Sequence, residues 1–459
     1  MLRVPGIVLI ATGGSAMTSA EETDSRGILF PYAEIFRIPR AWRFSVAGII
    51  GRMPMAMYGL GTVLLISAVT GRYAVAGSVS AAGSLAGALC SPQMGRLVDR
   101  HGQHRVLVPL CIIFAVSVTG LVVAVQAGAP DWTLFAAGAL GGAAMPALGP
   151  MARARWSALL ADSPRLHTAF SLESVADEVC FILGPAAVTL LATQVHPAAG
   201  VTAAALLCLG GTLWFASQRG TEPPVRIRDQ ALHTERKGHP RTGQPSFFPA
   251  PGLGVLLPVY VFLGGMFVSI DLATVAFAAH AGHKPLAGLI LGTYALGSAT
   301  GGLWYGTRTW RAPASRRLAI TLTMTVAGVC TFWAMPNLLA LTFVIYLCGM
   351  TIAPTLIAGF SLLEATARPG RTTEAMSWLS TGIVFGVACG ATGAGFVLDA
   401  FGPRWGYAFA ASCGVAAAAL CLAGLRRLAS LSQPYPQPNS RAYSPASVRT
   451  SSTYQVAWL

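Results

Sequence analysis

Residues 91–107 read SPQMGRLVDRHGQHRVL, a short charged stretch between two long apolar runs. The runs on either side, 73–94 and 105–127, hold more than 20 residues each and at most one charged side chain. An α-helix rises about 1.5 Å per residue, so each run matches the roughly 30 Å hydrocarbon core of a bilayer. The stretch is therefore predicted to be a tight loop that joins two membrane-spanning helices.

The composition of the whole chain fits the same interpretation. The 459 residues are 54% hydrophobic and 10% charged, whereas soluble domains carry about 25% charged residues. The 51 glycines and 29 prolines are also in keeping with membrane helices, which use both residues more often than soluble helices do. We therefore predict an all-α integral membrane protein.

Apolar runs of spanning length recur in two groups of six, separated by a polar stretch. Two equal groups of this kind are typical of transporters built from repeated halves, so twelve transmembrane helices in two six-helix halves are expected. The predicted spans are 44–70, 73–94, 105–127, 132–152, 169–193, 198–218, 252–279, 286–307, 316–335, 337–362, 375–398 and 404–425. The predicted domains are a cytoplasmic N-terminal segment 1–42, the halves 43–218 and 252–425, a cytoplasmic linker 219–251, and a disordered cytoplasmic tail 426–459.

The basic residues give this arrangement an orientation. With both termini in the cytoplasm, 27 of the 31 Lys and Arg lie in cytoplasmic segments. The periplasmic loops then hold only Arg72, Lys284 and Arg404, and Arg52 lies inside a span. Such an excess is the positive-inside pattern of membrane proteins. It accounts for the net charge of +14 without a nucleic-acid partner, because the charges are spread over many loops.

The first 16 residues contain Arg3, a short apolar run and small residues, as a signal peptide does. We favour another interpretation, in which translation starts at Met17, because the polar segment that follows suits a cytoplasmic N-terminus.

The loop at 91–107 also carries a recognisable spacing. Gly95, Asp99, Arg100, Gly102 and Arg105 match G-x-x-x-D-R-x-G-x-x-R, which resembles the signature loop between spans 2 and 3 of the major facilitator superfamily. This copy departs from the family at Gln103, where a basic residue is usual. The resemblance implies a multi-pass secondary transporter of the bacterial inner membrane that functions as a monomer.

In that family the loop forms a cytoplasmic gate between the two halves. Asp99, at a helix end, is expected to face the positive N-terminus of a neighbouring helix. Arg100 and Arg105 are expected to pair with acidic residues at other cytoplasmic ends, and Glu374 is the candidate partner.

Further glycine motifs are predicted to serve helix packing. Gly395, Asp399 and Gly402 repeat part of the gate spacing at the opposite membrane face, whereas Gly306 replaces the Asp in the loop after span 8. Gly184-Pro185 in span 5 is similar to the Gly-Pro of the antiporter motif of drug exporters, although Cys180 stands where that motif has a glycine.

Ionisable groups inside spans are costly and usually functional. Glu173 and Asp177 lie four residues apart on one helix face, and Glu178 is rotated from Asp177 by about 100°. These acids either couple transport to protons, with Asp177 the leading candidate, or pair with Arg153, Arg155 or Arg165 in the preceding loop. Arg52 needs an internal partner, for which Asp271 and the span 5 acids are candidates. No buried basic residue stands in the middle of span 4, where many proton antiporters of the family that this chain resembles carry one.

By resemblance, spans 1, 4, 7 and 10 would line a central cavity, with a contribution from span 11. Methionine and aromatic side chains there would suit bulky apolar substrates. The candidate cavity residues are Met53, Met57, Tyr58, Met145, Met266, Tyr346, Pro354 and Trp378.

The function expected from these features is proton-coupled efflux of a hydrophobic or amphipathic small molecule. Proton-coupled uptake of a small polar solute such as a sugar is the alternative, and a non-transporting receptor or sensor is the alternative of another class. No metal, cofactor or enzymatic activity is expected, since the sequence has neither metal-ligand spacings nor a nucleotide-binding loop. A proton gradient would then supply the energy.

Overall fold

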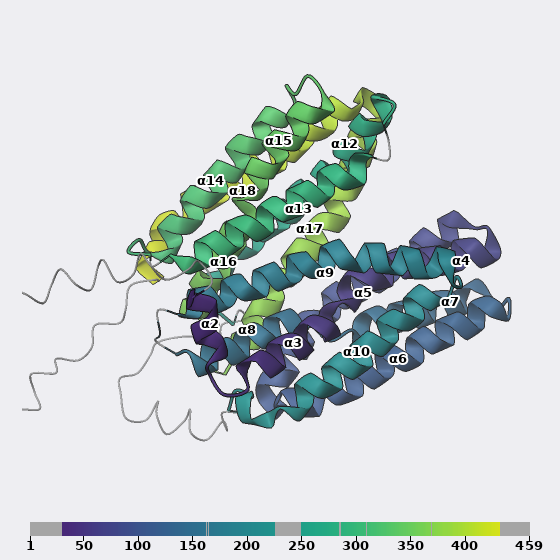
Figure 1. Cartoon of the computed structure of the whole chain (residues 1–459), viewed down its shortest axis with the longest axis horizontal. Coiled ribbons are helices and arrows are strands. Elements are labelled where there is room, and N and C mark those ends of the chain that lie inside the picture. Colours follow the sequence, from purple (N-terminus) through teal and green to yellow (C-terminus); the bar gives the residue numbers. More distant parts are fainter. Residues whose placement is uncertain are drawn as a thin grey trace, which may run out of the picture.

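The computed structural model describes residues 30–161, 163, 165–224, 249–283, 286–308, 310–368 and 370–431. Within these ranges the secondary structure is entirely helical. The first bundle of Figure 1, coloured purple to teal, contains the helices before the linker. Its helices are α2 (Phe30–Phe36), α3 (Ala41–Arg52), α4 (Pro54–Thr70), α5 (Tyr73–His101), α6 (Gln103–Gln126), α7 (Asp131–Ala144), α8 (Leu148–Leu159), α9 (Leu166–Gln194), α10 (Ala199–Ser217) and the 3₁₀ turn η1 (Arg219–Thr221).

The second bundle, coloured green to yellow in Figure 1, contains the helices after the linker. These are α12 (Leu253–His280), α13 (Leu286–Thr307), α14 (Ala314–Phe332), α15 (Leu338–Gly349), α16 (Ile352–Thr366), α17 (Thr372–Phe401) and α18 (Pro403–Leu431). The N-terminal residues 1–29 with Met17, the linker core 225–248 and the tail 432–459 lie outside the described residues.

Ten helical segments in the described ranges are long and apolar enough to cross a bilayer. Three of them join two consecutive helices: α3 with α4, α7 with α8, and α15 with α16. Prolines explain two of the breaks, because Pro54 and Pro146 cannot donate a helical hydrogen bond. Helices α5 and α14 occupy the positions of two further predicted spans. They are not apolar enough over a spanning length to be counted as membrane-crossing by composition alone.

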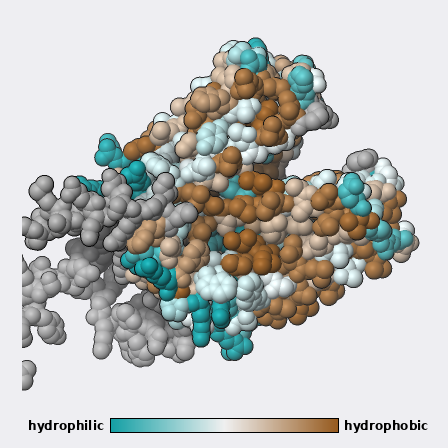
Figure 2. All heavy atoms as spheres, in the orientation of Figure 1, coloured by the Kyte–Doolittle hydropathy of each residue, from teal (hydrophilic) through white to brown (hydrophobic). Residues whose placement is uncertain are grey.

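The two bundles meet at one end and diverge at the other (Figure 1). We call the first the linker end, because α10 ends there and α12 begins there. The halves touch through α5 with α17 and through α9 with α13 and α16. Figure 2 shows the notch that separates them at the other end, which we call the open end. The molecule is therefore closed at the linker end and open at the opposite end.

Small residues let the helices approach closely within each half. A Cβ atom on Gly142 of α7 would run into the backbone of Gly83 in α5, and one on Gly386 of α17 would run into Val261 of α12. Helices in lipid associate largely through such close contacts. The many glycines of the sequence therefore serve packing in both halves.

The boundaries differ from the sequence-based ones at the end of span 4. Arg153 and Arg155, expected in the loop before span 5, lie in α8 and are 3% and 0% exposed. Both arginines lie beyond the predicted end of span 4 at residue 152, so the middle of that span still carries no basic residue. The hydropathy pattern ended the span too early because both arginines find their partners inside the protein.

Candidate functional site

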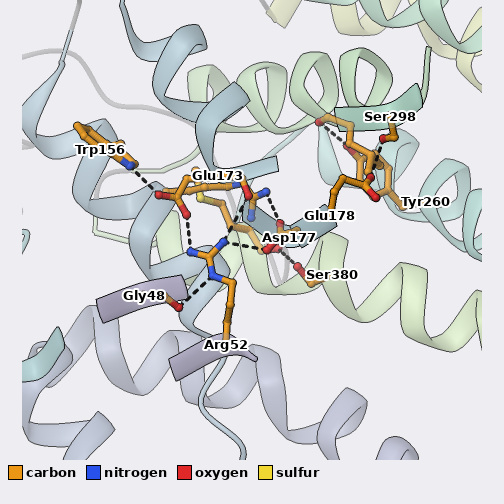
Figure 3. Close-up of polar contacts among 12 residues, drawn as sticks. Gly48, Arg52, Trp156, Glu173, Asp177, Glu178, Tyr260, Ser298 and Ser380 are labelled. Atoms are coloured by element: carbon orange, nitrogen blue, oxygen red, sulfur yellow. Dashed lines mark hydrogen bonds and ion pairs between the residues drawn. The ribbon is translucent and has the colours of Figure 1, made fainter. Parts of the chain in front are cut away.

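A network of buried charges lies where α3, α8 and α9 meet in the first half (Figure 3). The Arg52 guanidinium forms ion pairs with the carboxylates of Glu173 and Asp177, the second at 2.8 Å. Its Nε also donates a hydrogen bond to the Gly48 carbonyl oxygen at 3.2 Å. Arg52 is only 2% exposed, so its charge is neutralised inside the protein. The predicted alternative pairing of Arg52 with Asp271 does not form.

Two residues of α8 complete this network. Arg153 Nη2 lies 2.8 Å from the second carboxylate oxygen of Asp177, and the Trp156 indole donates to Glu173 at 2.8 Å. Glu173 and Asp177 reach these partners because residues four apart share a helix face. Of the partners considered from the sequence, Arg155 and Arg165 do not contact these acids; Arg165 pairs with Glu34 at 3.3 Å. The contacts favour a structural role for Glu173 and Asp177.

Glu178 and Asp271 have a different environment. Glu178 accepts a hydrogen bond of 2.6 Å from the Ser298 hydroxyl of α13, which belongs to the other half (Figure 3). Asp271 is an exposed residue of α12, and it lies within electrostatic range of Glu178 and of Tyr294. Neither carboxylate forms an ion pair with any basic residue that the structure describes.

The charges on the spanning helices in this region therefore do not balance. Arg52 and Arg153 offset Glu173 and Asp177, whereas Glu178 and Asp271 stand without a counter-charge in the described ranges. An unpaired carboxylate is expensive at membrane depth. Its cost is removed when it binds a proton or a cation, so these two acids can exchange one for the other.

A second cluster holds the halves together at the linker end. Asp99, near the end of α5, accepts hydrogen bonds from the backbone N–H groups of Thr373 and Glu374, at 3.2 and 2.9 Å. These groups lie in the first turn of α17, where the helix dipole is positive. Gly95 permits the approach, because a Cβ atom there would lie 2.9 Å from the Glu374 Cα.

Glu374 is held by arginines other than the expected ones. Its carboxylate pairs with Arg96 and Arg371, each at 2.7 Å. Arg100 and Arg105 are exposed and form no ion pair among the described residues, so the pairing predicted for them is wrong. Arg96 lies one turn before Asp99 on the face of α5 that meets α17, and Arg100 is rotated away from it. Arg96 falls on a variable position of the sequence motif, so the motif predicted no role for it.

Comparison with known proteins agrees with this architecture. Residues 44–283 and 256–453 match the model of a family described as the Major Facilitator Superfamily. The chain belongs to the Major Facilitator Superfamily. The resemblance predicted from 91–107 is thus confirmed, and the chain is a multi-pass membrane protein of the secondary-transporter kind. No curated protein matches the sequence.

Solved transporters share the fold at low sequence identity. The structure is similar to the human organic anion transporter MFSD10 (TETRAN), with 16% identity, a TM-score of 0.63, and coverage of 83% of this chain and 100% of that one. A bacterial homologue of the iron transporter ferroportin in its outward-facing state has 14% identity, a TM-score of 0.64 and coverage of 86% and 100%. The transporter FucP in the outward conformation has 14% identity, a TM-score of 0.61 and coverage of 86% and 99%.

The departure from the superfamily motif at Gln103 has a local explanation. Gln103 is 1% exposed, donates to the Met151 carbonyl at 3.0 Å and accepts from Arg155 at 2.6 Å. The Arg155 guanidinium also lies 3.8 Å from the Phe215 ring centre. A basic residue at 103 would face this buried cation, so the neutral amide fits the site.

The second glycine motif and the Gly-Pro pair have separate environments. Asp399, near the end of α17, is exposed and has no ion pair among the described residues, and Gly402 has a φ of 88° after the helix end. A side chain at Gly395 would meet nothing within 4 Å. Gly184 packs against α4, where a Cβ atom would lie 2.8 Å from that of Ala56, and Pro185 lies inside α9. Asp399 therefore makes no latch like that of Asp99 in this conformation.

The predicted cavity residues divide into two sets. Four of the eight residues are packed inside the bundles, so the expectation that they line a cavity is corrected. Tyr58, for example, donates a hydrogen bond to the Gly138 carbonyl at 2.9 Å and packs on the Phe114 ring. The buried set is Met57, Tyr58, Met266 and Pro354. The partly exposed set is Met53, Met145, Tyr346 and Trp378.

We expect Asp99→Asn to loosen the linker end. The amide loses the charge that faces the start of α17 and can accept fewer hydrogen bonds, at a cost of about 1–2 kcal/mol. Amide hydrogen exchange at the start of α17 should rise about five- to thirtyfold, because exchange follows the opening equilibrium. Asp131→Asn is the matched control, since it breaks only the exposed pair with Arg72. Equal exchange in both variants would contradict a latch at Asp99.

Proposed function

We propose that this chain is a proton-coupled exporter of amphipathic small molecules, with Glu178 and Asp271 as the groups that bind the proton. The observation that carries the proposal is the isolation of these two carboxylates. The two neighbouring acids of α9, Glu173 and Asp177, are both paired with arginines. Glu178 belongs to the first half and Asp271 to the second, so a proton or cation bound between them acts on both halves.

The proposed topology has twelve spans, with both termini in the cytoplasm of a bacterium and the spans in its inner membrane. The positive-inside excess of Lys and Arg supports this orientation. The linker end is then cytoplasmic, and the open end faces the periplasm. Two of the similar solved structures are likewise outward-facing.

A cationic amphipathic substrate fits the site better than a neutral or anionic one. Two carboxylates without counter-charges attract a cation and repel an anion. The partly exposed methionine and aromatic residues offer an adaptable apolar surface. Protons and substrate would then compete for the same carboxylates, which couples entry of the one to exit of the other. A metal ion fits less well, because the described residues contain no group of three or more metal-ligating side chains.

The experiment uses proteoliposomes that contain the purified protein and a trapped pH dye. Ethidium, added on one side under an imposed pH gradient, should drive protons in the opposite direction, and empty liposomes give the background. Proton movement no greater than this background, for ethidium and for a panel of hydrophobic cations, would contradict the proposal.

Proton-coupled uptake of a small polar solute remains the second candidate. The open end would let a solute bind from the outside as well as let a substrate leave to the outside. One similar structure is a fucose:proton symporter. In the same liposomes, fucose or another hexose would then move protons in its own direction, whereas an exporter of cations would ignore it. Binding of a ligand with neither proton nor ligand movement would instead favour a receptor.

A further inference from the structure

The linker end is closed by two contacts between the halves, and only one of them uses the signature motif. Asp99 joins α5 to α17, as described above. On the other side, α9 meets α13, and the last turn of α13 has Gly306 where the motif would supply an Asp. This second contact therefore lacks the carboxylate that fastens the first.

Helix α2 fills the place of the missing side chain. The Tyr32 hydroxyl donates a hydrogen bond to the Leu303 carbonyl in the last turn of α13, at 2.9 Å. A Cβ atom on Gly306 would run into this hydroxyl and into Ser171. Tyr32 is 5% exposed and Ile35 is 0% exposed, so this short helix is packed into the protein rather than lying on its surface.

The helix is tied to the first half and reaches the second. It contacts both α9 and α13, and Glu34 pairs with Arg165 just before α9 at 3.3 Å. The Thr168 hydroxyl of α9 adds a hydrogen bond of 2.7 Å to the Gly306 carbonyl. Two hydroxyl donors from the first half thus hold the end of α13, where the helix dipole is negative. At the start of α17 the roles are reversed, because there the Asp99 carboxylate of the first half accepts hydrogen bonds from N–H donors of the second half.

We propose that α2 is a second latch of the linker end, in which the Tyr32 hydroxyl holds the last turn of α13 until the halves separate there. The latch compensates for the missing Asp at 306. Since α2 belongs to the first half, the bond to Leu303 breaks whenever α9 and α13 part. Tyr32 is therefore a positioning residue that sets how readily this end opens.

Hydrogen exchange of the full-length protein in micelles, without substrate, tests the latch. Tyr32→Phe keeps the ring and removes one hydrogen bond, so exchange at the end of α13 and the start of α9 should rise about two- to tenfold. Tyr407→Phe is the matched control, because its hydroxyl bonds to Thr274 at 3.0 Å within the second half. It should leave exchange at the ends of α9 and α13 unchanged.

A second variant perturbs the latch from the other side. Gly306→Ser displaces the Tyr32 hydroxyl and Ser171 of α9 together, so exchange at the end of α13 should rise at least as much as in Tyr32→Phe. Wild-type exchange in Tyr32→Phe, or an equal rise in Tyr407→Phe, overturns the proposal. The readout involves neither substrate nor a pH gradient, so its failure would be distinct from a failure of the proposed proton coupling.

Discussion

Replacing Asp271 by asparagine and Glu178 by glutamine is expected to reduce substrate-driven proton movement in proteoliposomes to the level of empty liposomes. An amide side chain does not bind a proton in the physiological range, so the double variant has no exchangeable site between the halves. The shapes of both side chains are kept, and the Ser298 hydroxyl can still donate to the amide carbonyl oxygen introduced by Glu178→Gln. Folding should therefore be preserved.

The midpoint of thermal unfolding in micelles separates this loss from a general failure of folding. The double variant should unfold at the wild-type midpoint, whereas its ethidium exchange without a pH gradient should also weaken, because the same carboxylates are proposed to bind the substrate. Asp399→Asn is the matched control, because it removes an exposed carboxylate of α17 outside the cluster. Wild-type proton movement in the double variant would show that the coupling group lies elsewhere.

Replacing Arg52 by methionine is expected to destabilise the protein by about 3–5 kcal/mol, because it leaves Glu173 buried without its cation. Glu173 is 1% exposed, so water cannot compensate. The midpoint of thermal unfolding in micelles should fall accordingly. Arg72→Met, which breaks the exposed pair with Asp131, should leave the midpoint nearly unchanged, because water screens an exposed ion pair.

The double variant Arg52→Met with Glu173→Gln gives the decisive comparison for this pair. It removes both charges, and Asp177 keeps its ion pair with Arg153. Most of the lost stability should return, since the cost of the single variant is that of an orphaned charge. A double variant as unstable as Arg52→Met would mean that packing, rather than charge, makes Arg52 important.

The sequence predicted the contacts that depend on local geometry. The spacing of Glu173 and Asp177 placed both on one helix face, where Arg52 and Arg153 now hold them. Asp99 at a helix end was expected to face a helix N-terminus, and the structure places it at the start of α17. Both inferences need only the helical repeat and the helix dipole.

The other contacts could not be predicted because they depend on how distant segments meet. Arg153 looked like a loop residue, since hydropathy cannot detect an ion pair made at depth. Arg96 was one of several arginines near a cytoplasmic end, and only the rotation of α5 against α17 selects it. The isolation of Glu178 and Asp271 is likewise a property of the assembled halves. It results from the pairing of both nearby arginines with other acids.

Glu178 and Asp271, rather than the paired Asp177, are the groups proposed to exchange a proton for the substrate. Proton release when ethidium binds to the purified protein, followed with a pH indicator in weakly buffered micelles, distinguishes these two assignments. We predict release in the wild type and in Asp177→Asn, and no release in the double variant of Glu178 and Asp271. Undiminished release in that double variant, or its loss only in Asp177→Asn, would contradict the assignment of proton binding to Glu178 and Asp271.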